Sequence, residues 1–232
     1  MSEKNPIFGD RETKVLHSNG LKMAYEDFGQ PGDPAILLVA GLYNQLVRWP
    51  VEFCQMLADS GFYVIRFDNR DIGLTDKMDG VSAPGLLRLF LKSYLGVPVS
   101  APYSLNDMAA DTVGVLDALN IAQAHIVGMS MGGMISQLVT GLYPDRILSL
   151  TSIMSTSGER GKGVPSLKVS AEMIKPVTPE RSALDNAVDI WQTIGSPAYP
   201  MSDDQVRSLL AVSYTHLTLP TKRVGSMSVV AL

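Results

Sequence analysis

The first apolar and polar patterns along the chain are those of strands. Residues 12–17 and 21–26 alternate apolar with polar side chains, and Ser18-Asn19-Gly20 between them predicts a β-hairpin. Runs that are apolar throughout are instead typical of strands buried on both faces of a sheet. Such runs occupy residues 35–40, 62–67 and 124–127, and a further strand is predicted at residues 147–154.

Helical segments separate these strands. A helix is predicted from about Trp49 to Asp59, and residues 104–107 (Ser-Leu-Asn-Asp) resemble a capping box that opens a helix reaching Leu119. A third helix is predicted over residues 134–143, where Pro144 stops it. Strands that alternate with helices after a leading hairpin predict the α/β class, with a mostly parallel sheet covered by helices on both faces.

The character of the sequence changes at residue 155. Pro, Gly and Lys punctuate the chain as far as Pro179, and helices are predicted near residues 181–194 and 203–211. We therefore predict a core over residues 1–154 and the start of an inserted helical cap over residues 155–211.

Composition narrows the class of protein. The chain has 232 residues, of which 46% are hydrophobic, enough for one domain with a substantial core. A net charge of −4 and the lack of a basic stripe argue against a nucleic-acid partner. Residues 1–6 lack the apolar run of a signal peptide, and no stretch is long and apolar enough to span a bilayer, so we expect a cytoplasmic protein.

Cysteine and histidine usage points away from disulfides and metals. Cys54 is the single cysteine, which excludes an internal disulfide, and its apolar neighbours predict a buried thiol. Three histidines without a Cys/His cluster leave little material for a transition-metal site. We expect neither a metal nor a cofactor.

The most informative motif is Gly128-Met129-Ser130-Met131-Gly132-Gly133, because a buried strand precedes it and a helix follows it. Gly-x-Ser-x-Gly in this context is the nucleophile elbow, in which a tight turn presents the serine hydroxyl above the sheet. Gly128, Gly132 and Gly133 lack the bulk that such a turn would exclude. The alternative is a glycine-rich turn whose Ser130 merely caps the helix.

Attack by a serine hydroxyl on a carbonyl requires donors that stabilise the resulting oxyanion. One predicted donor is the backbone N–H of Met131, directly after the nucleophile. The second is expected in the loop after residues 35–40, where we choose the N–H of Leu42 because Gly41 allows close backbone approach.

A base for Ser130 is harder to find. His125 lies inside the predicted strand, where a structural role is favoured, and His17 lies in the leading hairpin. Only His216 follows Ser130, as the order of the triad in this arrangement requires. The later carboxylates lie in cap-like sequence, so the residues alone leave the triad incomplete. These are Glu159, Asp185, Asp189, Asp203 and Asp204.

Two further segments attract attention but are better explained by structure. Residues 68–73 (Asp-Asn-Arg-Asp-Ile-Gly) end the second buried strand, where an Asp/Arg pair bracing a turn is favoured over a substrate contact. Residues 85–95 predict an apolar helix with Arg88 and Lys92 one turn apart. Packing with a basic outer edge is favoured there over an acyl pocket or a membrane contact.

With these residues in place, the chain resembles the α/β-hydrolase-fold serine hydrolases, and within them the esterases typified by aclacinomycin methylesterase. The resemblance spans about residues 12–211, and Ala40 stands where many relatives carry histidine. It implies that Ser130 cleaves a small-molecule ester through an acyl-enzyme, without a cofactor. The segments that carry it are residues 41–42, 49–50, 66–74, 101–103, 107–111, 128–133 and 150–155.

The resemblance also implies two further strands, an acid and a histidine after residue 211. Residues 212–221 instead look like a translated sequencing adapter, so we expect a C-terminally truncated fold with a non-native tail over residues 212–232. His216 would then be accidental and this polypeptide nearly inactive, although its full-length parent would hydrolyse esters.

Two alternatives stay open at this stage. One is another serine-hydrolase reaction on the same fold, such as peptide or thioester cleavage or perhydrolysis, and the other is a non-catalytic module that binds a small ligand.

Overall fold

The computed structural model describes residues 12–78, 102–159, 166–173, 175 and 182–215. The described elements divide into two compact units. One contains all the described strands and the helices that precede residue 159, and the other contains the helices between residues 167 and 215.

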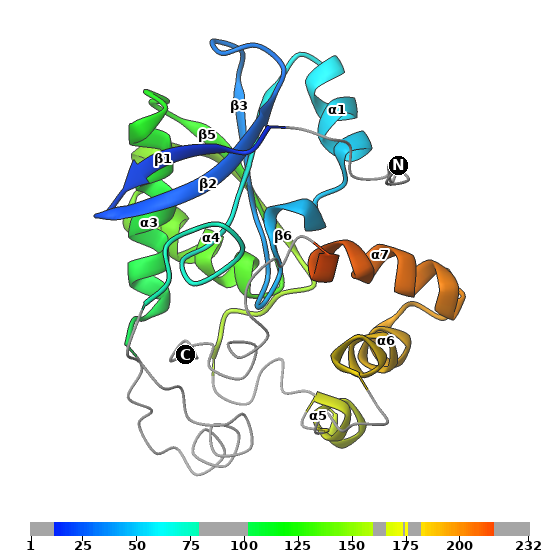
Figure 1. Ribbon diagram of the computed structural model, residues 1–232. Coiled ribbons are helices and arrows are strands. Elements are labelled where there is room, and N and C mark those ends of the chain that lie inside the picture. The colour runs from blue at the N-terminus through cyan, green and yellow to red at the C-terminus, as the bar shows by residue number, and fades with distance from the viewer. Residues whose placement is uncertain (1–11, 79–101, 160–165, 174, 176–181, 216–232) are drawn as a thin grey trace. The chain divides into compact units, whose positions relative to one another are not determined.

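The first unit is built on a six-stranded sheet with the order β1-β2-β4-β3-β5-β6 (Figure 1). β1 and β2 form the predicted hairpin, and β2 joins β4 in antiparallel orientation, whereas β4, β3, β5 and β6 run parallel to one another. The predicted α/β class with a mostly parallel sheet is therefore confirmed. The strands are β1 (Lys14–Ser18), β2 (Leu21–Phe28), β3 (Ala35–Val39), β4 (Tyr63–Phe67), β5 (Ala124–Met129) and β6 (Ile147–Ile153).

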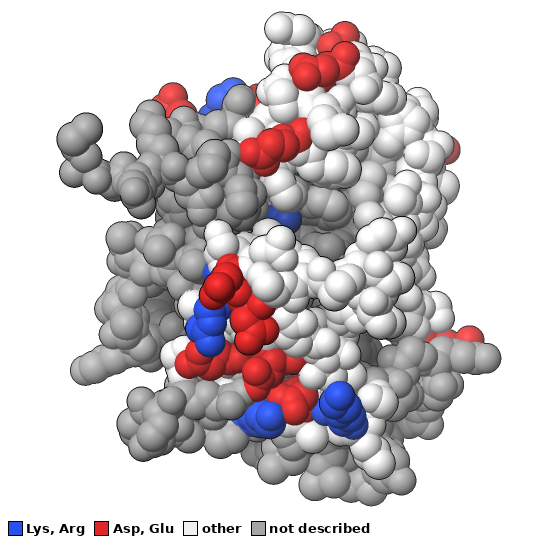
Figure 2. Space-filling model, turned by 90° about the vertical axis from the view of Figure 1, so that its right-hand side faces the viewer, with Lys and Arg blue, Asp and Glu red and all other residues white. Residues whose placement is uncertain are grey.

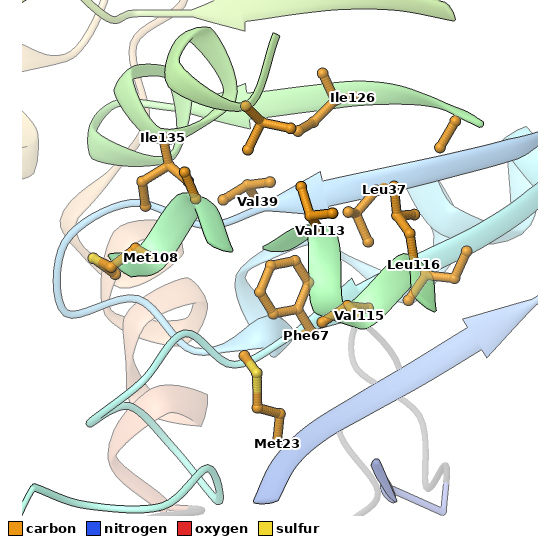
Figure 3. Close-up of a cluster of buried hydrophobic side chains, with 14 of the residues drawn as sticks. Met23, Leu37, Val39, Phe67, Met108, Val113, Val115, Leu116, Ile126 and Ile135 are labelled. Atoms are coloured by element: carbon orange, nitrogen blue, oxygen red, sulfur yellow. The ribbon is translucent and has the colours of Figure 1, made fainter. Parts of the chain in front are cut away.

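Helices cover both faces of the sheet. α3 (Leu105–Ala118) and α4 (Met131–Leu142) pack on one face and α1 (Val51–Asp59) on the other. The side chains of β3 alternate between these two faces: Ala35, Leu37 and Val39 join the larger cluster with α3 and α4 (Figure 3), whereas Ile36 and Leu38 join the cluster with α1. A strand buried on both faces needs the continuous apolar sequence that β3 has.

Local signals explain where several helices begin. The Ser104 hydroxyl accepts the Asp107 N–H, and the Asp107 carboxylate accepts the Ser104 N–H at 2.7 Å, which confirms the predicted capping box of α3. These hydrogen bonds hold the pKa of Asp107 below its usual value. α4 begins at Met131, three residues before the predicted start at Met134, because the turn that precedes it is a single residue long. The described part of the unit also contains two 3₁₀ turns, η1 (Leu46–Arg48) and η2 (Pro144–Arg146).

The alignment of β3 with β5 positions the candidate site. Val39, at the end of β3, pairs with Gly128 near the end of β5. The loops that follow these two strands therefore start side by side at the carboxyl edge of the sheet, where ligands bind in parallel α/β sheets.

The second unit consists of α5 (Leu167–Met173), α6 (Ala183–Ile194) and α7 (Asp203–Thr215). Val188, Val206 and Leu210 form its small core. On its surface acidic side chains gather beside a few basic ones (Figure 2), and Arg207 pairs with Asp185. α7 continues to residue 215, past the expected boundary at residue 211, whereas the predicted helix over residues 85–95 lies outside the described residues.

Two sequence-based expectations concern burial and membranes. Cys54 is fully buried against the α1 face of the sheet, as its apolar neighbours predict. Each helix in the part of the chain that the structure describes falls short of the length and hydrophobicity of a bilayer-spanning segment.

Candidate active site

Ser130 is the single residue between β5 and α4, and its backbone is strained. Its φ of 56° and ψ of −122° lie in a region that side chains other than glycine rarely adopt. The surrounding chain holds this conformation from both sides: the Ser130 N–H donates to the Ile153 carbonyl at 2.9 Å, and the Ser130 carbonyl accepts the Ser155 hydroxyl at 2.7 Å. The turn therefore has the sharp geometry of a nucleophile elbow.

The three glycines around Ser130 are required by close packing. A Cβ on Gly128 would lie 2.2 Å from the Gly132 carbonyl oxygen, and a Cβ on Gly132 would lie 2.2 Å from the Val39 carbonyl oxygen. A Cβ on Gly133 would lie 2.5 Å from the Cβ of Ser155. Because these neighbours are mostly backbone atoms, a side chain at these positions would push apart the strand, the turn and the helix.

The loop after β3 lies against this turn. A Cβ added to Gly41 would be 3.2 Å from the Cβ of Ser130 and 3.1 Å from the Met129 carbonyl oxygen. Among the described residues, neither the Leu42 N–H nor the Met131 N–H has a hydrogen-bond acceptor. Met131 is also the first residue of α4, so the positive end of the helix dipole lies at Ser130. The loop that carries Leu42 therefore lies against the turn at Ser130, and the N–H groups of Leu42 and Met131 are both without an acceptor in the described part of the chain.

The described histidines do not serve Ser130. His125 places Nδ1 2.7 Å from the Ser149 hydroxyl and packs edge-to-face on Phe62, in agreement with the structural role favoured from the sequence. His17 pairs with Lys22 in the leading hairpin, and His216 lies outside the described residues. In the described ranges no imidazole or carboxylate hydrogen-bonds the Ser130 hydroxyl.

The loop after β4 is braced mainly by Asp68. Its buried carboxylate accepts the N–H of Leu46 at 2.7 Å and that of Leu74 at 2.9 Å. Burial raises the pKa of Asp68 to about 6, against the lowering effect of the two N–H donors. Gly73 lies against this carboxylate, so closely that a Cβ there would overlap it.

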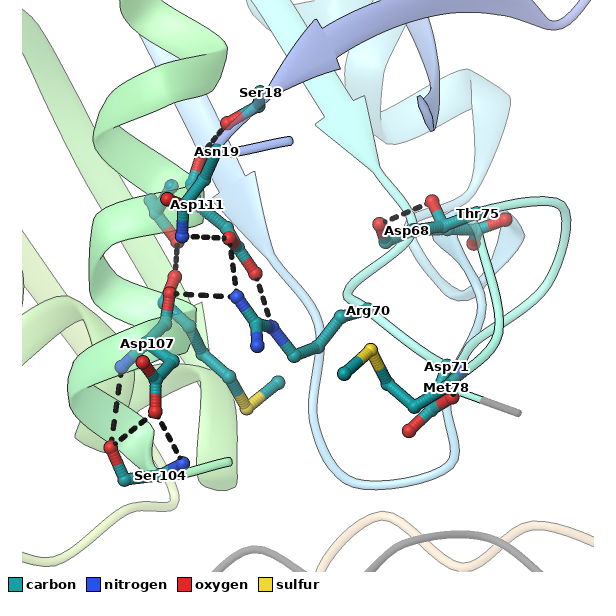
Figure 4. Close-up of polar contacts among 12 residues, drawn as sticks. Ser18, Asn19, Asp68, Arg70, Asp71, Thr75, Met78, Ser104, Asp107 and Asp111 are labelled. Atoms are coloured by element: carbon teal, nitrogen blue, oxygen red, sulfur yellow. Dashed lines mark hydrogen bonds and ion pairs between the residues drawn. The ribbon is translucent and has the colours of Figure 1, made fainter. Parts of the chain in front are cut away.

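The prediction of an Asp/Arg pair within this loop was wrong, because Arg70 pairs with a carboxylate outside the loop. Arg70 donates to Asp111 of α3, through Nε at 2.6 Å and through Nη2 at 2.7 Å (Figure 4). Its guanidinium also lies over the Tyr103 ring. The loop thus braces itself through one carboxylate and is tied to a neighbouring helix through Arg70. The sequence carried no signal for this pairing, because 41 residues separate the two partners.

Sequence reasoning also missed residues that support the site from a distance. Ser155 follows β6 and reaches Ser130 only because β6 pairs beside β5. Asn69 donates its side-chain amide to the Ala40 carbonyl at 3.0 Å. Local patterns cannot reveal such contacts, because they depend on which strands are neighbours in the sheet. For metals, the described residues contain no group of three or more potential ligands.

Comparisons with known proteins agree with this geometry. Rhodomycin D methylesterase DauP from Streptomyces sp. (strain C5) is 29% identical over 224 residues, and DnrP from Streptomyces peucetius is 28% identical. Each alignment covers 87% of this chain and 69% of the relative. The crystal structure of a meta-cleavage product hydrolase from Pseudomonas fluorescens has the same fold, with a TM-score of 0.62 and 20% identity, over 89% of this chain and 64% of that one.

The family assignment comes from a model of the alpha/beta hydrolase fold, which matches residues 34–185. This range includes β3 to β6, the strained turn at Ser130 and the loop at Leu42. The match covers more than half of the chain, so this protein belongs to the α/β-hydrolase fold family of hydrolases.

Proposed function

We propose that the protein is a serine hydrolase of carboxylic esters that works through an acyl-enzyme intermediate. The observation that carries the proposal is the strained backbone of Ser130, at a turn whose glycines admit no side chain. Strain of this kind persists at functional sites because the surrounding structure over-determines it. The methylesterase names of the relatives that align over 87% of this chain favour an ester substrate.

In the proposed mechanism the Ser130 oxygen attacks the carbonyl carbon of a small-molecule ester. The negative charge that develops on the carbonyl oxygen is stabilised by the N–H groups of Leu42 and Met131, and by the N-terminus of α4. Collapse of the tetrahedral intermediate releases the alcohol, and water then hydrolyses the acyl-enzyme. A base must accept the hydroxyl proton and return it to the leaving alkoxide.

We further propose that this 232-residue chain turns over slowly, because no base or orienting acid contacts Ser130 in its described residues. Loss of a triad base costs on the order of 10⁶ in kcat, and the oxyanion donors leave weak residual catalysis. His216 is the one histidine whose position the structure does not describe. The expectations of a cytoplasmic location and of a cap over residues 155–211 stay predictions.

Hydrolysis of p-nitrophenyl acetate, together with labelling by a fluorophosphonate, tests both proposals. We expect slow Ser130-dependent labelling that Ser130→Ala abolishes, because phosphonylation needs the same removal of the hydroxyl proton as acylation. Turnover should be far below ordinary enzyme rates and unchanged by His216→Ala. Equal labelling of the wild type and Ser130→Ala would overturn the assignment of the nucleophile. Fast turnover that depends on His216 would overturn only the absence of a base.

A further inference from the structure

Side chains from the end of β4 hold the loop that carries Leu42. We call residues 40–49 the oxyanion loop. At its start, the Asn69 side-chain amide donates to the Ala40 carbonyl at 3.0 Å, and Asn69 itself is 2% exposed. Farther along, the Asp68 carboxylate accepts the Leu46 N–H. Consecutive residues of one strand end therefore hold two points of the loop.

The far end of the oxyanion loop is held from the same strand. The guanidinium of Arg66 donates to the Trp49 carbonyl and also binds the carboxylate of Glu26, with its Nε 3.1 Å from Oε2. Arg66 is completely buried, so its charge has no access to water and depends on these partners. The loop is thus fixed at its beginning, middle and end by buried polar groups.

The contact at Ala40 bears most directly on the oxyanion donor. Only the two backbone rotations of Gly41 separate the Ala40–Gly41 peptide from the Gly41–Leu42 peptide, which carries the Leu42 N–H. The carbonyl of that second peptide accepts the Asn44 N–H at 3.2 Å. With both peptides held, the direction of the Leu42 N–H is determined. Glycine by itself would leave it free to turn.

We propose that Asn69 is a positioning residue for the reaction: its amide holds the Ala40 carbonyl, so that the Leu42 N–H faces the acyl oxygen of a substrate at Ser130. The inference rests on the proposed function. Asn69 does not touch the reacting atoms and acts through the backbone of the oxyanion loop. A displaced donor loses transition-state stabilisation, because the interaction needs a close approach to the developing charge.

The test compares Asn69→Leu, which keeps the size of the side chain but removes the donor, with Thr112→Val. Thr112 is also fully buried and donates its hydroxyl to a backbone carbonyl, that of Met108 at 2.8 Å, but it lies within α3. Each variant removes one buried side-chain donor that binds a backbone carbonyl, an amide in Asn69→Leu and a hydroxyl in Thr112→Val. The readout is phosphonylation of Ser130 by a fluorophosphonate, resolved into the maximal rate and the half-saturating probe concentration, with folding followed by circular dichroism.

We expect Asn69→Leu to lower the maximal labelling rate about tenfold or more, with little change in half-saturation. Thr112→Val should stay within about twofold of the wild type. An Asn69→Leu protein that folds and labels within twofold of the wild type would overturn the inference, as would an equal loss in both variants. If Asn69→Leu does not fold, Asn69→Ala leaves room for water, and the same outcomes decide.

The two levels of the proposal fail in different ways. Labelling that survives in Ser130→Ala removes the proposed function, and the positioning role with it. Labelling that depends on Ser130 but is insensitive to Asn69 removes the positioning role alone.

Discussion

The elbow at Ser130 and the oxyanion loop lie against each other, but the protein fixes them in opposite ways. At the elbow, side chains are missing: Gly128 and Gly132 let backbone atoms approach to distances that any Cβ would prevent. The oxyanion loop is instead held by side chains: Asp68 and Asn69, directly after β4, bind its backbone groups. The elbow depends on the absence of side chains at its glycines, and the oxyanion loop depends on buried hydrogen bonds.

Because of this difference, the elbow and the oxyanion loop should respond differently to mutation. A steric requirement is absolute over a few tenths of an ångström and tolerates no substitution. A buried hydrogen bond is worth about 1 kcal/mol net, and its loss costs more when it leaves a polar group unpaired. The elbow should therefore fail abruptly when mutated, and the oxyanion loop by degrees.

The largest effect is expected at Gly132. In Gly132→Ala the new Cβ would meet the Val39 carbonyl oxygen at 2.2 Å, and both atoms belong to rigid backbone. We expect a loss of about 4 kcal/mol or more, seen as a collapse of soluble yield or of the urea midpoint. Gly141→Ala is the matched control in the same helix, because a Cβ there meets nothing within 4 Å and should be neutral or slightly stabilising. Equal stability of the two variants would contradict the steric account.

The next effect concerns Arg70, which ties the loop after β4 to α3. Arg70→Met leaves the buried carboxylate of Asp111 without its cation and should cost about 3 kcal/mol in urea unfolding. Asp117→Ala, which breaks the exposed pair with Arg146, should cost less than about 1 kcal/mol. Adding Asp111→Leu to Arg70→Met should recover much of the loss. A double variant as unstable as the single one would refute the explanation by unpaired charge.

Asp68 gives a prediction about pH. Its pKa is raised in the fold to about 6, so the folded state binds its proton more tightly than the unfolded state does. The contribution of this carboxyl to stability is therefore fully present below about pH 4 and is lost as the pH rises through 6, by about 3 kcal/mol. The unfolding free energy of the wild type minus that of Asp68→Asn should fall by this amount between pH 4 and 7. A difference that stays constant or grows would show that the carboxyl is not desolvated.

The smallest effect is expected at Ser155, where the elbow, like the oxyanion loop, is held by a side-chain hydrogen bond to its backbone. Ser155→Ala removes the hydroxyl that binds the Ser130 carbonyl at 2.7 Å and should cost about 1 kcal/mol, with a several-fold loss in fluorophosphonate labelling. Ser60→Ala removes an exposed hydroxyl that donates to the Met56 carbonyl at 2.8 Å and serves as the control. If both variants label like the wild type, the Ser155 hydroxyl is not needed to hold the nucleophile in place.

Much of the fold and part of the site could be predicted, because their signals are local. Alternation predicted the hairpin of β1 and β2, apolar runs predicted the parallel strands, and the spacing of Ser104 and Asp107 predicted the start of α3. The glycine spacing around Ser130 predicted the strained turn.

The contacts that complete the site could not be predicted in the same way. The partner of Arg70 is Asp111 rather than a neighbour in its own loop, and Asn69 binds a carbonyl 29 residues away. These pairings follow from the order of strands in the sheet, which local patterns do not specify.

The amino-acid sequence by itself determined which segments become strands and helices and where the chain must bend at Ser130, because propensity, periodicity and the absence of a Cβ act over a few residues. Only the tertiary structure decided which buried polar groups meet: β4 beside β3 brings Asn69 to Ala40, and β6 beside β5 brings Ser155 to Ser130. The physical reason is that a buried donor must find an acceptor wherever the packed chain provides one, and that position is a property of the whole sheet.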